Sequence, residues 1–178
     1  KIGPKNLQKS KSGRNTYQVI ANGGMGLFLC ITSHYYQEEV FFYMFLASIA
    51  AANSDTWATE IGKLSKTTPK DIISGRSLIH GESGGITNIG LLGSIAGSAI
   101  ISTLGFILNL SLSFMLIVFI SGFLGSIFDS ILGSTLQSRF ISRNGKNITE
   151  TKSKNKYLYS GLSLINNNTV NLVCTISA

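Results

Sequence analysis

The chain has 178 residues, of which 44% are hydrophobic and only 13% are charged, about half the charged fraction of ordinary globular proteins. The net charge is +7, and two cysteines are too few for a disulfide scaffold. The apolar content excludes a disordered chain and favours an all-α, polytopic transmembrane helix bundle over a soluble domain.

Five apolar segments follow one another along the chain, each read as a transmembrane helix because about 20 residues cross the hydrocarbon. They are residues 17–33, 40–62, 86–108, 112–136 and 162–178. The last stops while still apolar, and the chain begins at a lysine rather than a methionine. We therefore expect a single membrane domain over residues 1–178, from a fragment of a longer chain or a processed one.

The lysines and arginines fall in three blocks between these segments, within residues 1–16, 63–80 and 138–160. None occurs between Arg14 and Lys63 or between Arg76 and Arg139. This is the pattern of loop charge in a membrane protein, so we expect no nucleic-acid partner. Five spans place all three blocks on one side, which the positive-inside rule assigns to the cytoplasm.

Polar residues gather in the half of each expected span that lies next to the basic loops. Three are acidic, Asp55 and Glu60 in the second span and Asp129 in the fourth. Since a carboxylate in hydrocarbon costs at least about 2.5 kcal/mol, we expect the three to share a hydrated layer. The amides and hydroxyls expected in the same layer are Asn22, Thr56, Thr87, Gln137, Asn167, Asn168 and Asn171.

Glycines at helical spacing predict close approaches. Gly125, Asp129, Gly133 and Gln137 form an i, i+4 stripe in the fourth span, whose glycines would let another backbone or a ligand approach the carboxylate. In the third span, the G-x-x-x-G formed by Gly93 and Gly97, with Gly90 and Ser94 beside it, predicts a close-packing face.

These residue types favour phosphate chemistry. Asp55, Glu60 and Asp129 are hard oxygen donors suited to Mg²⁺, which takes one or two carboxylates together with phosphate oxygens. The Ser83-Gly84-Gly85 turn before a helix offers backbone N–H groups to phosphate, and Arg14 adds an anion contact. The apolar helices beneath these residues would hold a lipid tail. Taken together, these features predict phosphoryl transfer at a membrane surface. It contains no P-loop motif.

The sequence also resembles a known family. Residues 53–62, N-S-D-T-W-A-T-E-I-G, are similar to the central signature of the family catalogued as domain of unknown function 92. Residues 13–24, 83–87, 125–137 and 167–171 match its other blocks in order. This family contains the plant and cyanobacterial phytyl-phosphate kinases. The resemblance implies an integral membrane protein and a CTP-dependent kinase that makes a prenyl diphosphate from its monophosphate.

On this hypothesis, the acids Asp55, Glu60 and Asp129 are catalytic and bind Mg²⁺. The residues expected to bind phosphate and nucleotide are Arg14, Asn22, Thr56, Ser83, Gly84, Gly85, Thr87, Gln137, Asn167, Asn168 and Asn171. The expected partners are the lipid bilayer, a prenyl-phosphate lipid and a nucleoside triphosphate such as CTP. The chain length of the lipid, the identity of the nucleotide and the oligomeric state stay open.

Other interpretations of the same residues also stay open. A transporter could use the acids as an ion path, but residues 40–46 and 112–120, on the far side, are apolar. A non-enzymatic membrane protein gives no reason for acids at three helix positions. Asp55 and Glu60 could form helix-end ion pairs with Arg14 or Lys63, while Gln137 and the asparagines could bridge helices.

Overall fold

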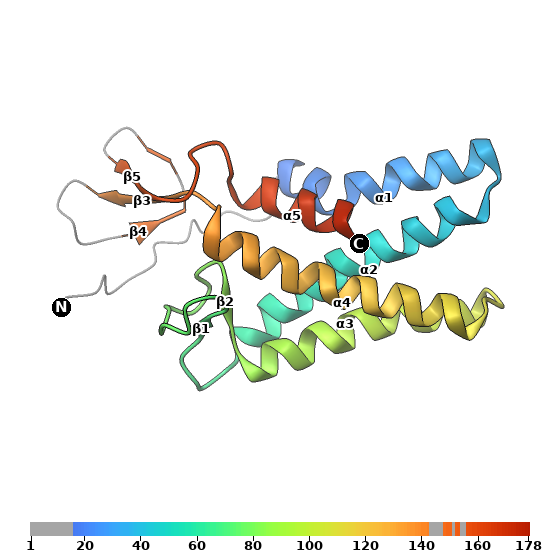
Figure 1. Cartoon of the computed structure of the whole chain (residues 1–178), viewed down its shortest axis with the longest axis horizontal. Coiled ribbons are helices and arrows are strands. Elements are labelled where there is room, and N and C mark those ends of the chain that lie inside the picture. Colours follow the sequence, from blue (N-terminus) through green and yellow to red (C-terminus); the bar gives the residue numbers. More distant parts are fainter. Residues whose placement is uncertain (1–15, 143–147, 151, 154–155) are drawn as a thin grey trace.

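The computed structural model describes residues 16–142, 148–150, 152–153 and 156–178. Its helices are α1 (Thr16–Tyr36), α2 (Glu39–Gly62), α3 (Asn88–Ile107), α4 (Leu112–Thr135) and α5 (Asn167–Ser177). Figure 1 shows them side by side along the long axis of the molecule, with the strands gathered at one end. The predicted all-α helix bundle is confirmed.

Four of the helices join as two hairpins at the end away from the strands (Figure 1). The turns contain Gln37 and Asn109, each with a φ of 53°. Asparagine tolerates this left-handed conformation better than most residues because its side chain can form a local hydrogen bond. No lysine or arginine lies between Arg14 and Lys63 or between Arg76 and Arg139, so the described lysines and arginines all lie toward the strand end.

Short strands form in the segments expected to be basic loops. Strand β1 (Lys70–Asp71) pairs with β2 (Gly85–Ile86), and the order β4-β3-β5 joins β4 (Ile148–Thr149), β3 (Arg139–Ser142) and β5 (Lys156–Ser160). Both sheets are antiparallel. Strands of two to five residues carry too little alternation to be predicted from the sequence. They fold the two loops back over the end of the bundle.

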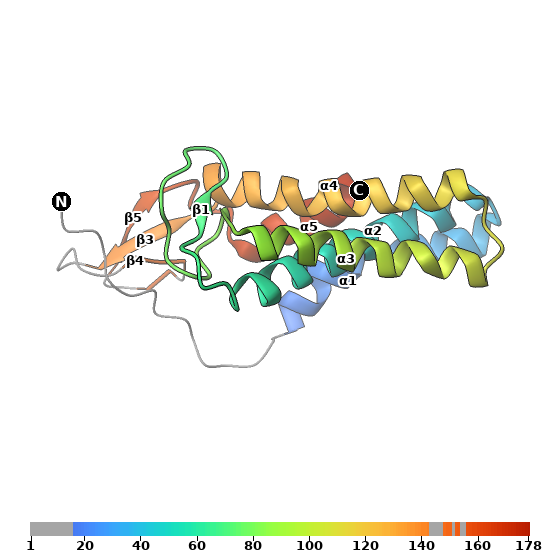
Figure 2. The same cartoon turned by 90° about the horizontal axis from the view of Figure 1, so that it is seen from below.

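Helix α5 begins later than its expected segment, residues 162–178. The Asn166 side chain caps it by accepting a hydrogen bond from the Thr169 backbone N–H at 3.1 Å, so residues 162–166 precede the helix. At 1.5 Å per residue, its eleven residues extend for about 16 Å, roughly half the hydrocarbon thickness. Figure 2 shows α5 between α4 and α2, and it contacts both.

Large apolar side chains cover the outside of the bundle. Helices α3 and α4 are each long and apolar enough to cross a membrane. Only 39% of the most apolar stretch of α3 and 28% of that of α4 are buried within the protein. Side chains such as Leu27 on α1 and Phe106 on α3 are exposed by 63% and 66%. Apolar surface this extensive is unusual for a soluble monomer, whereas lipid would solvate it.

Small residues bring α2 and α3 into close contact. A Cβ added at Gly93 would lie 2.8 Å from the Trp57 carbonyl oxygen, and one at Gly97 would lie 3.0 Å from the Ser54 Cα. This confirms the predicted close-packing face. The Ser54 hydroxyl donates to the Ser94 carbonyl at 2.8 Å, and the Ser94 hydroxyl donates to Ser126 of α4 at 3.0 Å.

Gly122 allows α4 to pack closely against α2, as the glycines of α3 do for α3 and α2. A Cβ there would lie 2.6 Å from the Ala50 Cβ and 2.5 Å from the Ser98 Oγ, so the helices would have to separate. We expect Gly122→Ala to destabilise the protein by about 1–3 kcal/mol, measured as a lower thermal midpoint in detergent. The control is Gly24→Ala, whose Cβ would meet only Ile20 at 3.4 Å. Equal midpoints for the two variants would contradict a tight α2–α4 contact.

Candidate functional site

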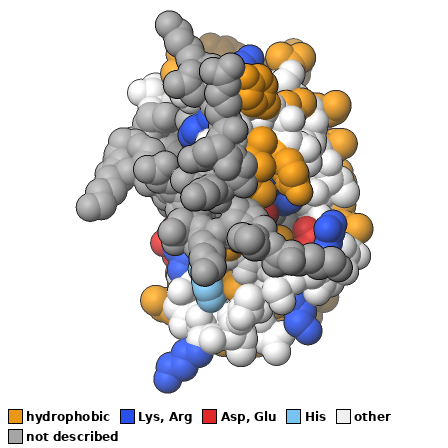
Figure 3. All heavy atoms as spheres, turned by 90° about the vertical axis from the view of Figure 1, so that its left-hand side faces the viewer, with side chains coloured by type: hydrophobic (Ala, Val, Ile, Leu, Met, Phe, Trp, Pro, Cys, Tyr) orange, Lys and Arg blue, Asp and Glu red, His pale blue; other side chains and the backbone are white. Residues whose placement is uncertain are grey.

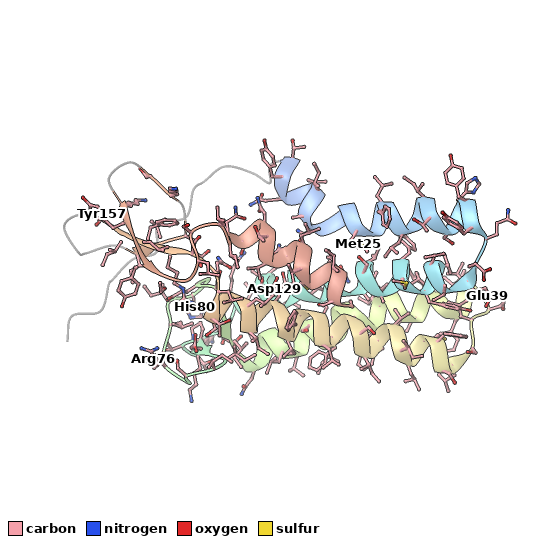
Figure 4. All side chains as sticks on the ribbon, turned by 45° about the horizontal axis from the view of Figure 1, so that its top comes forward. Met25, Glu39, Arg76, His80, Asp129 and Tyr157 are labelled. Carbon is pink, nitrogen blue, oxygen red and sulfur yellow. The ribbon has the colours of Figure 1, made fainter. Side chains whose placement is uncertain are left out.

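A polar cavity of about 840 Å³ lies at the strand end of the bundle, walled by helices, the 80–87 loop and strand residues. Figure 4 shows Asp129 within the bundle, between His80 at the strand end and Met25 on α1. The cavity brings together most of the sequence-predicted site residues. These are Asn22, Asp55, Thr56, Glu60, Ser83, Gly84, Gly85, Thr87, Asp129, Asn167, Asn168 and Asn171. Arg14 lies outside the described residues.

Asp55 and Asp129 reach the cavity from different helices. Asp55 lies on α2 and Asp129 on α4, and both side chains are partly buried. The two carboxylates are close enough for their charges to interact. The shared layer expected for these two carboxylates is therefore present in the fold. Because both side chains are acidic and lie near each other, their negative charges repel.

Helix α5 contributes amides beside Asp129. The side-chain amide of Asn171 is best satisfied when its nitrogen points toward α4. The nitrogen then donates to Asp129 Oδ2 at 3.2 Å and to the Asn167 carbonyl at 3.0 Å, and the oxygen faces the Asn22 side chain at 2.9 Å. One amide thus links α1, α4 and α5. This is the helix-bridging role that the sequence left open, at a position that also lines the cavity.

Glu60 lies apart from the other two acids, at the rim of the cavity. Its carboxylate forms an ion pair with Lys63, three residues along the chain, and its side chain is 59% exposed. The helix-end ion pair considered for Glu60 is thus present. Within the described ranges, no three acidic, histidine or cysteine side chains are grouped closely enough to hold a metal ion. Asp55 and Asp129 form a pair, and Glu60 lies outside it.

The Ser83-Gly84-Gly85 loop packs against the end of α4. Gly84 has a φ of +80°, and a Cβ there would lie 2.6 Å from the backbone N and Cα of Ser134. From the opposite side, a Cβ at Gly133 would lie 2.9 Å from the Gly84 nitrogen. The glycine stripe of α4 therefore admits another stretch of backbone, as the spacing predicted.

Hydrogen bonds hold Ser83 on three sides. Its N–H donates to Glu150 Oε1 at 2.9 Å, its Oγ accepts from Gln137 Nε2 at 2.8 Å, and its carbonyl accepts from Arg139 Nη2 at 2.7 Å. Gln137 is buried and is not part of the cavity lining, so it contacts the loop and not the cavity. Thr87 Oγ1 caps α3 by accepting from the Gly90 N–H at 3.1 Å. Gln137 thus helps to position the loop, and Thr87 begins the helix that follows it.

Sequence reasoning missed the charged residues that the strand segments bring to the site. Glu82, Glu150 and Lys152 line the cavity together with Lys63, which was already considered from the sequence, and Arg139 Nη1 lies 3.6 Å from Glu82 Oε1. Glu150 is 67 residues from its partner Ser83, so no local spacing could have revealed this contact. The described lining carries five carboxylates, from Asp55, Glu60, Glu82, Asp129 and Glu150, against two lysines.

Comparison with known proteins identifies the class of molecule. The family described as "Integral membrane protein DUF92" matches residues 3–178. The chain belongs to this family. It is 30% identical over 194 residues to Protein PGR of Arabidopsis thaliana, and this match covers 93% of this chain and 66% of that protein. It is also 30% identical over 132 residues to an uncharacterized membrane protein of Methanocaldococcus jannaschii, covering 74% of this chain and 55% of that protein.

The chain spans about two thirds of the length of the first relative and about half that of the second. No solved structure matches it. Membership in an integral membrane family explains the exposed apolar surface of α3 and α4 as a surface that faces lipid. The polar cavity therefore lies at one end of the membrane-embedded bundle. Figure 3 looks onto this end and shows Lys and Arg side chains on it.

Asp71 fastens the loop between α2 and α3 to α4. Its Oδ2 accepts from the Ser134 hydroxyl at 2.7 Å, and its Oδ1 accepts from the backbone N–H groups of Ser74 at 2.7 Å and Ile73 at 3.1 Å. Burial by itself would raise the pKa of Asp71. The hydrogen bonds to the carboxylate outweigh burial and hold the pKa below its ordinary value of 3.8.

This lowered pKa predicts a pH-dependent stability. A carboxylate with a lower pKa in the folded state stabilises it fully above the unfolded value, and the contribution is lost as pH falls through the folded pKa. We expect Asp71→Asn to have a lower thermal midpoint than wild type near pH 7. The difference should shrink as the pH falls below about 4. A difference that stays constant as the solution is acidified would contradict the role of the Asp71 carboxylate.

Proposed function

We propose that the chain is the phosphotransferase part of a prenyl-phosphate kinase. It would transfer a phosphoryl group from a nucleoside triphosphate, CTP in the first instance, to phytyl or another prenyl monophosphate. The observation that supports this is the meeting of Asp55 and Asp129 in a polar cavity at the basic end of a lipid-embedded bundle. A water-soluble nucleotide could enter from that end, and the lipid from the side.

The lining suits Mg²⁺. Asp55 and Asp129 would hold the ion directly, with hydroxyls such as those of Thr56 and Ser130 at the same cavity wall, since Mg²⁺ prefers oxygen donors and takes one or two carboxylates. Five carboxylates against two lysines would repel phosphates unless a cation offsets them. When bound, Mg²⁺ would neutralise charge on the phosphate oxygens.

The other predicted residues would orient the phosphates. Asn22, Asn167 and Asn168 present amides to the cavity, and amide N–H groups donate to phosphate oxygens. Glu60 would hold Lys63 at the rim, where the ammonium can meet the nucleotide. The acceptor needs no strong general base, because a phosphate monoester is already anionic near neutral pH. Catalysis would thus consist of positioning and charge stabilisation.

We also propose that this end faces the cytoplasm, where nucleotides are available. The positive-inside rule supports this orientation because the loops at the opposite end carry no lysine or arginine.

The decisive experiment incubates the purified protein with phytyl or geranylgeranyl monophosphate, Mg²⁺ and each nucleoside triphosphate in turn. We expect prenyl diphosphate from wild type and little from Asp55→Asn, with the largest yield from CTP. Equal product from the two proteins would contradict the proposed role of Asp55. No product from wild type, together with ion flux in liposomes, would favour the transporter instead.

A further inference from the structure

A second cavity, of about 330 Å³, lies between α1 and α2 beside the polar one. Its apolar walls are Val19 and Gly23 on α1 and Ile49 and Ala52 on α2. We call this cavity the side groove. Three of its lining residues, Gln18, Asn22 and Thr56, also line the polar cavity. The two spaces are therefore neighbours, and one molecule could occupy both.

The side groove leads from the polar cavity toward the interior of the membrane. Thr56 lies at its polar end, and Ile49 lies seven residues deeper along α2, a rise of about 10 Å. Beyond that level the two helices close together. A Cβ added at Gly26 would lie 2.6 Å from Ile49 Cδ1, so these residues form the floor.

The wall on α1 also borders the lipid. Val19 is 61% exposed and its neighbour Ile20 is 57% exposed. At Gly23, by contrast, an added Cβ would meet no described atom within 4 Å. The missing side chain at Gly23 thus leaves space on the face of α1 that lines the side groove, next to residues in contact with the bilayer.

We propose that the side groove holds the first part of the hydrocarbon chain of a lipid monophosphate whose phosphate lies in the polar cavity. This inference rests on the proposed function. The continuity of the two spaces supports it, because the polar end of such a molecule needs the amides and its chain needs an apolar path. The groove is bounded by one pair of helices and by the floor at Gly26 and Ile49, so it has room for the first part of a chain and not for its whole length.

Gly23→Phe is the variant that tests this. No described atom lies within 4 Å of a Cβ at this position, so the substitution starts from open space, and its ring would occupy the groove. The matched control is Gly24→Phe, at the next residue, whose Cβ would meet only Ile20 Cγ2 at 3.4 Å and which does not line the groove. Thermal midpoints of both variants in detergent check that each is folded.

Two measurements are made on the purified protein. In the first, kcat/KM is compared for geranylgeranyl monophosphate and dimethylallyl monophosphate, whose short chain does not reach the floor. We expect Gly23→Phe to lower the value for the long substrate by about tenfold or more, and the value for the short one by much less. Gly24→Phe should leave both near wild type. An equal loss on both substrates, or no loss, would overturn the proposal.

The second measurement needs no activity. A prenyl monophosphate that carries a diazirine in the chain is photo-crosslinked to wild type and to Gly23→Phe, and the labelled peptides are mapped. Labelling of α1 and α2 around Gly23 and Ile49, lost in Gly23→Phe but kept in Gly24→Phe, supports the side groove. Labelling elsewhere overturns it. A protein that is labelled in the groove but forms no diphosphate would refute the proposed kinase activity and leave the groove assignment standing.

Discussion

Asp129→Asn is expected to reduce the rate of prenyl diphosphate formation by about a hundredfold to a thousandfold. The change keeps the shape of the side chain and its ability to accept a hydrogen bond from Asn171, but it removes one carboxylate of the Asp55–Asp129 pair in the cavity. Asp55 alone would hold Mg²⁺ more weakly than the pair, and the ion would then neutralise less of the charge on the phosphates. The measurement is the initial rate at saturating lipid and nucleotide over a range of Mg²⁺ concentrations.

Glu60→Gln is the matched control for this prediction. Glu60 also lies on the cavity lining, but it is at the rim, exposed and paired with Lys63. Exposed ion pairs contribute at most about 1 kcal/mol, so we expect a loss of less than about tenfold. If Glu60→Gln and Asp129→Asn lost activity equally, the special role given to the Asp55–Asp129 pair would be wrong.

The second large effect is expected at Gly84. Its φ of +80° costs a residue with a Cβ about 1–2 kcal/mol, and that Cβ would lie 2.6 Å from backbone atoms of Ser134. We expect Gly84→Ala to destabilise the loop by about 2–5 kcal/mol. Because Ser83 would shift away from Gln137 and Glu150, most of the activity should be lost. Thermal unfolding and the phosphotransfer rate measure the two effects.

Gly75→Ala separates backbone strain from the steric contact. Gly75 lies in the same loop with a φ of +67°, but a Cβ there would meet no described atom within 4 Å. The variant should therefore lose only about 1–2 kcal/mol of stability and keep its activity. Equal damage from the two substitutions would show that the loop does not depend on its contact with α4.

The helices could be predicted because the chain separates apolar segments from charge so completely. Apolar stretches of about 20 residues between lysine-rich blocks leave few alternatives to membrane spans, and the first four helices run over the four segments expected. The start of α5 was harder to predict. Its position depends on capping by Asn166, and residues 162–165 before the cap are more apolar than the helix itself.

The site could be predicted only where topology alone determines it. Asp55, Asp129 and the asparagines lie at a similar level along the bundle because each is near the end of its helix that adjoins the basic loops. Asp71, Glu82, Arg139 and Glu150 were missed because their positions depend on how the loops fold back. The contact of Asp71 with Ser134, for example, joins residues 63 positions apart. For Glu60 the spacing to Lys63 already suggested the ion pair.

The central claim is that Asp55 and Asp129 together bind a divalent cation for a nucleotide. Electron paramagnetic resonance of Mn²⁺, titrated into the purified protein with CTP, tests it most directly. We expect a saturable Mn²⁺ site in wild type and in Glu60→Gln, with affinity at least about tenfold weaker in both Asp55→Asn and Asp129→Asn. Equal Mn²⁺ affinity in wild type and the two aspartate variants would contradict it.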